Sequence, residues 1–219
     1  VKNLLDLIRQ KQANVSDRPV FLHFSTDEVY GDIVDGEHVE TDILKPSNPY
    51  SASKAAADML VMAWGRTYGL KYVILRPTNN YGIGQYPEKL IPLTVKLLMR
   101  GKKIKLHDKG EPIRNWLHSA DTAAAVTTLV ETGTSDGIYN VAGGFEQKNI
   151  ETVSKVIECY FEEKKDCAPY LDLGHIREGQ DVRYALSDKK LRALGWRPTK
   201  NFDEEITGIV SYYKNNFKW

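Results

Sequence analysis

Five residues near the N-terminus have the side chains that a proton-transfer site requires. Tyr50 and Lys54 are four apart, so on a helix they lie on one face, one turn from each other. A lysine ammonium beside a tyrosine lowers a pKa that is otherwise about 10. Thr26, Asp27 and Glu28 directly follow an apolar run, and of two adjacent carboxyls in a cleft one can stay protonated while the other is ionised. The set can therefore both remove and deliver protons.

Each of these patterns also has a purely structural explanation. An Ala-rich helix shows Tyr-x-x-x-Lys by chance, with a packed or solvated tyrosine, and Thr26-Asp27-Glu28 is equally a turn with two solvated acids. Tyr-x-x-x-Lys is nevertheless the base of nicotinamide-dependent dehydrogenases. The neighbouring acid and base indicate that this protein also eliminates water.

The elements around these residues predict an α/β fold with a parallel sheet, because helical and strand patterns alternate. The apolar run 19–24 predicts a strand that ends where parallel sheets bind their ligands. Asn48-Pro49 predicts the start of a helix over about 50–68, which Gly69 ends. The other expected elements are strands at 72–75 and 138–141 and helices from Pro87 to Gly101, over 119–132, and near 149–164, 188–194 and 203–217.

Composition favours a protein that binds small molecules. Thirty basic and twenty-nine acidic residues are scattered and leave a net charge of +1, so we expect no nucleic-acid partner. The cysteines and histidines lack metal-ligand spacing and no apolar run is long enough for a membrane span, so we expect no metal, no membrane association and a cytoplasmic location. The helix over 50–68 is apolar on nearly every side, which predicts a homodimer.

Seven stretches resemble the extended short-chain dehydrogenase/reductase family, and within it most closely the dTDP-glucose 4,6-dehydratases. In chain order they are STDEVYG, NPYSASKAAAD, LRPTNNYG, YPEKLIP, IRNWLHSADTAAA, YNVAGG and RYALSDKKLRALGW. The resemblance spans nearly the whole chain and implies a partial Rossmann-like parallel sheet with a smaller α/β substrate-binding lobe. It assigns 1–80 to the NAD-binding domain with the catalytic residues and 81–219 mainly to the nucleotide-sugar lobe, with 119–142 returning to the first domain.

The resemblance also implies a reaction, the conversion of dTDP-glucose to dTDP-4-keto-6-deoxyglucose. Tyr50 would remove the proton of the 4-hydroxyl as hydride passes to NAD, Thr26 would orient that hydroxyl, and Lys54 would lower the tyrosine's pKa and hold the nicotinamide ribose. Glu28 would take the proton from carbon 5 while Asp27 protonates the departing 6-hydroxyl. The hydride would then return to carbon 6.

Binding residues are implied in the same way. The cofactor-binding set is Ser25, Tyr50, Lys54 and Asn80, and the substrate-binding set is Asn79, Glu88, Lys89, Leu90, Arg114, Asn149 and Arg177. An arginine suits a diphosphate because its planar fork binds oxygens in pairs. Apart from the resemblance, Arg114 is equally a surface ion pair and Asn79-Asn80 a turn.

Three departures from the family pattern leave alternatives open. His107 stands where the family commonly has tyrosine and Gln180 where histidine is usual, so the choice of thymine or uracil stays open. No Gly-x-x-Gly-x-x-Gly turn occurs, so we expect a chain that lacks the family's N-terminal portion. The alternatives are a UDP-sugar 4-epimerase or decarboxylase, which needs only the Tyr/Lys pair, and a noncatalytic truncated fragment.

Overall fold

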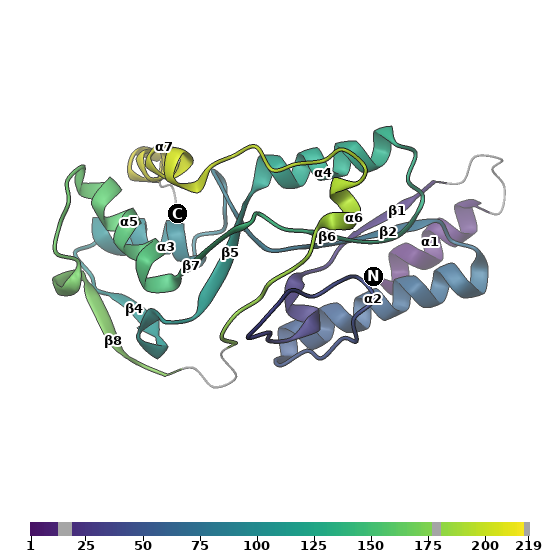
Figure 1. The fold of residues 1–219 in the computed structure, drawn as a ribbon, viewed down its shortest axis with the longest axis horizontal. Helices are drawn as coiled ribbons and strands as arrows, with labels where there is room; N and C mark the ends of the chain where they lie inside the picture. The colour runs from purple at the N-terminus through teal and green to yellow at the C-terminus, as the bar shows by residue number, and fades with distance from the viewer. Residues whose placement is uncertain (13–18, 177–180, 217–219) are drawn as a thin grey trace. The chain divides into compact units, whose positions relative to one another are not determined.

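A computed structural model describes residues 1–12, 19–176 and 181–216 of the chain (Figure 1). These residues divide between two compact units. The first unit draws on 1–78, 122–142 and 184–197, and the second on 79–121, 143–183 and 198–219. Residues 184–197 thus belong to the first unit, although the sequence-based division does not single them out.

The first unit is built on a parallel sheet with the strand order β1-β2-β6, which confirms the predicted α/β class. Leu22 pairs with Val73, and Ile74 pairs with Ile138. Helices α1 and α2 lie side by side along this sheet (Figure 1). The elements are α1 (Lys2–Gln12), β1 (Phe21–Phe24), η1 (Asp27–Tyr30), α2 (Pro49–Tyr68), β2 (Tyr72–Pro77), β6 (Asp136–Val141), α6 (Lys189–Arg192) and most of α4 (Ser119–Glu131).

The two faces of this sheet are covered differently. Neighbouring residues of a strand point to opposite faces. Ile74 packs into a buried cluster with Leu5 of α1 and Val61 of α2. On the other face Val73 and Leu129 of α4 line an apolar groove. The groove runs beside β1, the strand at one end of the sheet.

The predicted limits of α2 are confirmed. The helix follows its N-cap Asn48, has proline at its first position, and ends where Gly69 adopts the left-handed conformation (φ 65°). A glycine reaches this conformation without the steric cost that a Cβ brings.

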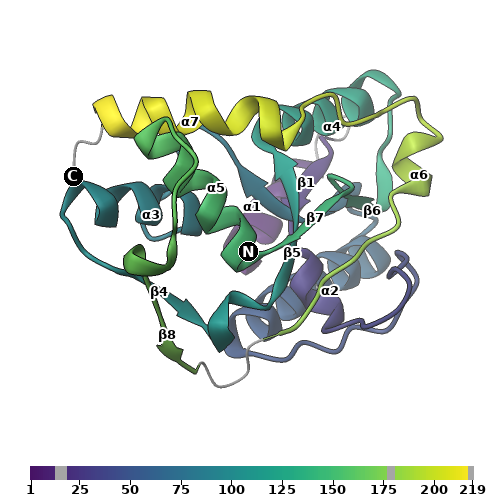
Figure 2. The same cartoon turned by 60° about the vertical axis from the view of Figure 1, so that its left-hand side comes forward.

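The described part of the second unit combines short strands with three α-helices and two 3-10 turns. Strand β5 pairs in parallel with β3 and antiparallel with β7, while β4 and β8 form a separate parallel pair. Helices α3, α5 and α7 pack against one another (Figure 2). The elements are β3 (Asn79–Tyr81), α3 (Leu90–Met99), β4 (Ile104–His107), η2 (Asp108–Gly110), β5 (Ile113–His118), β7 (Phe145–Lys148), α5 (Asn149–Phe161), η3 (Ala168–Tyr170), β8 (Leu171–His175) and α7 (Phe202–Asn216).

Two predicted helix boundaries in this unit are wrong. Helix α3 begins at Leu90 rather than Pro87, because Pro87 lies in a turn closed by a hydrogen bond from the Lys89 amide to the Tyr86 carbonyl oxygen (3.0 Å). Helix α5 ends at Phe161, because the next residue leaves the helix in a left-handed conformation (φ 61°).

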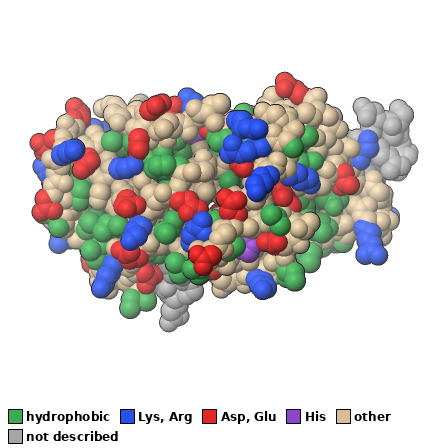
Figure 3. All heavy atoms as spheres, in the orientation of Figure 1, with side chains coloured by type: hydrophobic (Ala, Val, Ile, Leu, Met, Phe, Trp, Pro, Cys, Tyr) green, Lys and Arg blue, Asp and Glu red, His purple; other side chains and the backbone are tan. Residues whose placement is uncertain are grey.

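The surface and the helices agree with the balanced composition. Acidic and basic side chains are interspersed over the face drawn in Figure 3. Each helix in the described ranges is too short or too polar to traverse a bilayer.

Candidate active site

The 3-10 turn η1 carries the two candidate acid-base residues just beyond the carboxyl end of β1. Thr26 is its N-cap, and its Oγ1 accepts a hydrogen bond from the Glu28 amide (3.4 Å) and donates one to Asp27 Oδ1 (3.0 Å). Asp27 is 2% exposed, whereas Glu28 is half-buried. The turn therefore holds one carboxyl inside the unit and presents the other toward its surface.

The end of the turn requires a glycine. Gly31 has a φ of 83°, and a Cβ at this position would lie 2.4 Å from the Lys45 carbonyl oxygen. The Lys45 amide in turn donates to the Val29 carbonyl oxygen (3.1 Å). The loop that follows is thus tied back onto the turn.

The start of helix α2 is fixed by a reciprocal capping box. The Asn48 side chain accepts a hydrogen bond from the Ser51 amide (2.9 Å), and Ser51 Oγ accepts one from the Asn48 amide (3.2 Å). Tyr50 and Lys54 lie in the first two turns of the helix, so the cap determines the positions of both residues.

Tyr50 lies within the electrostatic reach of the η1 turn. Its pKa is raised above the ordinary value, first by partial burial and then by the charges of Glu28 and Asp27, while a hydrogen bond with Thr26 acts in the opposite direction. These couplings bring Tyr50 and the three turn residues into one site. The shift keeps the hydroxyl protonated, which is opposite to what a general base requires.

The cofactor-binding residues expected in this unit lie at the end of β1. Lys54 Nζ donates a hydrogen bond to the Phe24 carbonyl oxygen (2.5 Å), so the lowering of the Tyr50 pKa expected from Lys54 is not what the structure shows. Ser25 Oγ is buried and has no hydrogen-bond partner in the part of the chain that the structure describes. Because a buried hydroxyl without a partner costs free energy, Ser25 and Lys54 fit a polar ligand group at this edge of the sheet.

A buried polar network lies behind the turn. Arg76 of β2 is 1% exposed and donates to Asp58 Oδ2 on α2 (2.9 Å) and to Tyr30 Oη (2.7 Å). Tyr30 donates to Asn140 Oδ1 on β6 (2.8 Å). Burial raises the pKa of Tyr30 to about 12 and keeps the phenol neutral. The network fixes η1 against a helix and two strands.

The remaining predicted binding residues within the described ranges belong to the second unit. Asn79 and Asn80 form strand β3 rather than a turn, and Asn79 pairs with Trp116 of β5. Asn79 Oδ1 is buried without a hydrogen-bond partner among the residues described, and the Asn80 carbonyl oxygen accepts from Gln85 Nε2 (2.8 Å). Asn79 is therefore the member of this pair with an unused acceptor.

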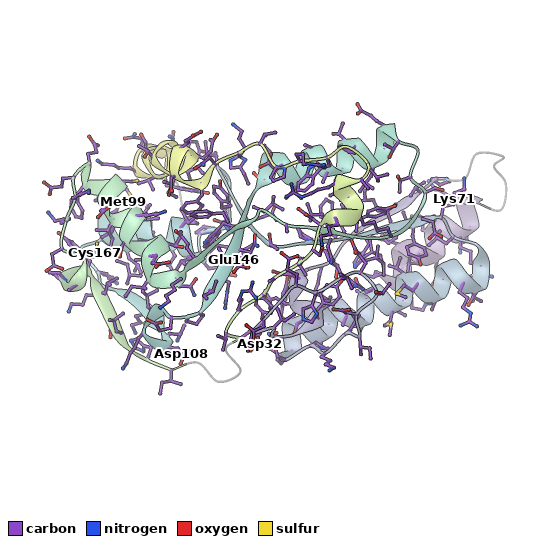
Figure 4. All side chains as sticks on the ribbon, viewed as in Figure 1. Asp32, Lys71, Met99, Asp108, Glu146 and Cys167 are labelled. Atoms are coloured by element: carbon purple, nitrogen blue, oxygen red, sulfur yellow. The ribbon has the colours of Figure 1, made fainter. Side chains whose placement is uncertain are left out.

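Arg114 is half-buried on β5, opposite Gln147 of β7. Its guanidinium donates to the Ile113 carbonyl oxygen (2.7 Å) and to the Asp181 carbonyl oxygen (3.3 Å). The neighbouring carboxylate on β7, Glu146, labelled in Figure 4, accepts two hydrogen bonds from Arg183 instead (2.9 and 3.1 Å). Backbone carbonyls thus orient Arg114 on the strand.

The other predicted residues of this unit occupy the starts of two helices. Glu88 and Lys89 are exposed before α3, and Leu90 packs against the core. Asn149 begins α5, and its amide donates to the Pro112 carbonyl oxygen (3.0 Å). Arg177 and Gln180 lie outside the described residues, and the ring of His107 packs edge-on against His175.

Sequence reasoning missed two contributions to the site. Asn48 was predicted only as a helix start, yet its Nδ2 also donates to Glu28 Oε2 (3.5 Å). From the sequence, Arg76 is assigned no role. Arg76 directly follows the apolar run 72–75, and a charged residue that continues a buried strand indicates a buried partner. No local pattern names that partner, because Asp58 and Tyr30 are far away in the sequence.

Comparison with known proteins identifies the family. The family model described as GDP-mannose 4,6 dehydratase matches residues 1–209. The chain belongs to the GDP-mannose 4,6 dehydratase family. Within this family it is 41% identical over 213 residues to dTDP-glucose 4,6-dehydratase 1 of Escherichia coli K12, covering 91% of this chain and 59% of the relative. The chain thus spans about three-fifths of that relative's length.

Solved structures share the fold of this GDP-mannose 4,6 dehydratase family member. A dTDP-glucose 4,6-dehydratase from Streptomyces venezuelae, with NAD and TYD bound, superposes with a TM-score of 0.89 at 36% identity and covers 98% of this chain and 64% of its own. A UDP-glucose 4-epimerase from Thermus thermophilus in complex with NAD gives a TM-score of 0.85 at 29% identity, with 98% and 68% covered. The fold alone therefore does not separate dehydratase from epimerase.

Proposed function

We propose that the protein carrying this chain is an NAD-dependent nucleotide-sugar 4,6-dehydratase that converts dTDP-glucose to dTDP-4-keto-6-deoxyglucose. The observation that carries the proposal is the η1 turn, which gathers Asp27, Glu28 and Thr26 within electrostatic reach of Tyr50. Oxidation of an alcohol needs one base, whereas elimination of water needs an acid and a base in addition. The site contains one group for each task.

We assign each side chain the role that the family resemblance implies. Tyr50 accepts the proton of the 4-hydroxyl, which Thr26 orients. The resulting ketone acidifies carbon 5, and the half-buried Glu28 takes the proton from that carbon. Asp27 donates a proton to the 6-hydroxyl, so that the carbon–oxygen bond breaks and water leaves. Return of the hydride to carbon 6 and of a proton to carbon 5 would complete the 4-keto-6-deoxy sugar.

The cofactor assignment rests on the end of β1. Ser25, with a buried hydroxyl that lacks a partner in the described chain, and Lys54 would hold NAD there, together with Tyr50; Asn80 of the second unit is proposed for the same ligand. Bound NAD supplies a reversible hydride acceptor and a positive nicotinamide charge. The nicotinamide charge would oppose the upward shift of the Tyr50 pKa that burial, Glu28 and Asp27 produce.

The proposed substrate residues belong to the second unit. Arg114 is oriented by two backbone carbonyls and offers a fork for the diphosphate. Asn79 offers a buried acceptor, and Glu88, Lys89, Leu90, Asn149 and Arg177 complete the proposed nucleotide-sugar set. We propose thymine as the base, which a comparison of kcat/KM for dTDP-glucose and UDP-glucose tests.

A UDP-sugar 4-epimerase is the second candidate, since the Thermus thermophilus epimerase shares the fold. An epimerase uses the Tyr50/Lys54 pair but has no need of Asp27. The test is therefore the product of wild type and Asp27→Asn incubated with dTDP-glucose and NAD. A dehydratase forms the 4-keto-6-deoxy sugar, and Asp27→Asn retains the first oxidation but loses about 10² to 10⁴ in elimination rate. A wild type that forms no 4-keto-6-deoxy sugar contradicts the proposal.

We also propose a homodimer, supported by an apolar surface on adjacent helices. Leu4 and Leu7 of α1 are 55% and 47% exposed, and Met59 of α2 is 57% exposed. These helices pack on each other, so their outer faces form one surface that a second copy can cover. A dimer mass at micromolar concentration that falls to the monomer mass in Met59→Glu is expected, and a monomeric wild type contradicts it.

A cytoplasmic location is proposed on separate grounds. Cys159 and Cys167 are both free thiols, and Cys167 donates only to backbone carbonyls at 3.5 and 3.9 Å. Free thiols persist in reducing compartments. Cell fractionation tests this proposal, and recovery of the protein from an oxidising compartment contradicts it.

A further inference from the structure

One side chain, Asn48, contacts both halves of the candidate active site. Its Oδ1 accepts the hydrogen bond from the Ser51 amide that begins helix α2 (2.9 Å). Its Nδ2 donates to Glu28 Oε2 on the η1 turn, and also lies 3.5 Å from Ser47 Oγ. The acceptor end of one amide therefore serves the helix that carries Tyr50, while the donor end serves the turn that carries Glu28.

The acceptor end defines the position of Tyr50. The capping box with Ser51, whose side chain is fully buried, leaves one possible start for the helix. The Asn48 carbonyl oxygen accepts from the Ala52 amide (2.9 Å), so the first turn closes directly on this residue. Tyr50 is two residues further along the chain, so the same hydrogen bonds fix its position.

The donor end selects one orientation of Glu28. The backbone of Glu28 is held by Thr26 Oγ1, but its carboxylate is half-buried and extends from the turn. Tyr50 on α2 is coupled electrostatically to Glu28 and to Asp27 on the same turn. An amide N–H that points at Oε2 is a favourable contact for an ionised carboxylate.

We propose that Asn48 is a positioning residue that sets the distance between the base Glu28 and Tyr50 and favours the ionised Glu28 carboxylate. This inference rests on the proposed dehydratase function. The proposed role predicts that asparagine at this position functions differently from the other residues that cap helices well. Aspartate and serine also accept the Ser51 hydrogen bond, but aspartate has no donor for Glu28 and the shorter serine does not reach it.

The test compares Asn48→Asp and Asn48→Ser with a matched control, Asn201→Asp. Asn201 precedes α7 in the second unit, where its Oδ1 accepts from the Asp203 amide (2.9 Å) and its carbonyl oxygen accepts from the Glu205 amide (3.0 Å). It is thus a second asparagine cap, with no role in the proposed chemistry. For each variant, kcat and KM for dTDP-glucose are measured across pH, together with Tm and the titration midpoint of the Glu28 carboxyl by ¹³C NMR.

Asn48→Asp is expected to lower kcat about tenfold with KM within twofold, because it replaces an N–H donor 3.5 Å from Glu28 Oε2 with a like charge. The added carboxylate disfavours ionisation of Glu28, so the pH below which activity is lost moves upward together with the NMR midpoint. Asn48→Ser is expected to lower kcat about fivefold. The pH below which activity is lost and the NMR midpoint of Glu28 should both move upward by less than in Asn48→Asp. Asn201→Asp is expected to leave kcat, KM and the pH profile unchanged.

Two results would overturn the inference. The first is a wild-type kcat and pH profile in Asn48→Asp. The second is a decrease in kcat that is in the same proportion to the decrease in Tm in the Asn48 and Asn201 variants. Such a result would indicate that Asn48 only caps its helix. If wild type itself forms no 4-keto-6-deoxy product, the proposed function fails. In that case an unmoved Glu28 midpoint in Asn48→Asp rejects the contact as well.

Discussion

The two units hold their candidate functional residues by different interactions. In the first unit, the turn with Asp27 and Glu28 is fixed from behind by the buried network of Arg76, Asp58 and Tyr30. The second unit has an aromatic core, in which Phe202 stacks on Phe145 at 5.1 Å between ring centroids. Tyr81 and Trp116 belong to the same cluster, together with aliphatic side chains of α3, α5 and α7.

This difference matches the task proposed for each unit. Acid-base chemistry requires carboxyls and hydroxyls at fixed distances, and a network of charge-assisted hydrogen bonds specifies those distances. The residues proposed to bind a nucleotide sugar lie at the margin of the apolar core, such as the exposed Lys89 before α3. The first unit is therefore expected to respond to loss of charge partners and to pH, and the second to loss of packing volume.

The largest effect is expected from breaking the buried ion pair. Arg76→Met leaves Asp58 as a buried carboxylate that has lost its Arg76 partner, which costs about 3 to 5 kcal/mol in the free energy of unfolding. Adding Asp58→Leu to Arg76→Met should restore part of this loss, because the stranded charge is then removed. Urea unfolding of the single and double variants measures it. A single variant as stable as wild type would show that the network does not hold the first unit together.

The next largest effect is expected on the free energy of unfolding at alkaline pH. The pKa of Tyr30 is about 12 in the folded unit, against an ordinary value of about 10, so the folded state favours the neutral phenol. The stabilisation that Tyr30 contributes to the folded state is fully present below pH 10. As the pH rises toward 12 it is lost, and the free energy of unfolding falls by about 2 to 3 kcal/mol. In Tyr30→Phe, the free energy of unfolding should fall correspondingly less over this range. Equal pH dependence in the two proteins would contradict the assignment.

A packing change in the second unit should have a smaller effect with a different signature. Phe202→Leu removes part of a buried ring that contacts Tyr81 and Phe145, at a cost of about 1 to 2 kcal/mol. We expect this cost to be the same at pH 7 and pH 10, because no charge is involved. Denaturant titrations at both pH values test it, and a pH-dependent cost would remove the distinction between the units.

The smallest predicted effect is electrostatic and confined to the first unit. The charge of Glu28 contributes to the raised pKa of Tyr50, so Glu28→Gln should lower that pKa, most clearly at low ionic strength. Titration of ¹³C-labelled tyrosine by NMR measures it, with Phe202→Leu as the control that leaves Tyr50 unaffected. An unchanged Tyr50 midpoint in Glu28→Gln would contradict the electrostatic coupling of the two residues.

Local sequence signals predicted the first unit well where they coincide with backbone constraints. Asn48 and Gly69 limit α2 because a cap and a left-handed glycine act within one turn of the helix. Pro87 misled the prediction of α3, since proline suits both a turn and a first helical position. The roles of the catalytic residues came from a resemblance rather than from spacing.

What the sequence could not predict depends on contacts between distant residues. Strands β4 and β8 are short and separated by more than sixty residues, so neither shows a pattern that identifies its partner. The network around Arg76 joins elements that are remote in the chain, and the amide of Asn48 reaches Glu28 twenty residues away. Such contacts follow from the packed structure and not from local periodicity.

Glu28 and its neighbours are proposed to perform an elimination through carbon 5 of the sugar. Its most direct test is the reaction of dTDP-glucose and NAD in D₂O, with the product followed by NMR for wild type and Glu28→Gln. The account predicts a 4-keto-6-deoxy product that carries solvent deuterium at carbon 5, and at least about a hundredfold less of it from Glu28→Gln. A 4-epimer without deuterium at carbon 5, or an unimpaired Glu28→Gln, would contradict it.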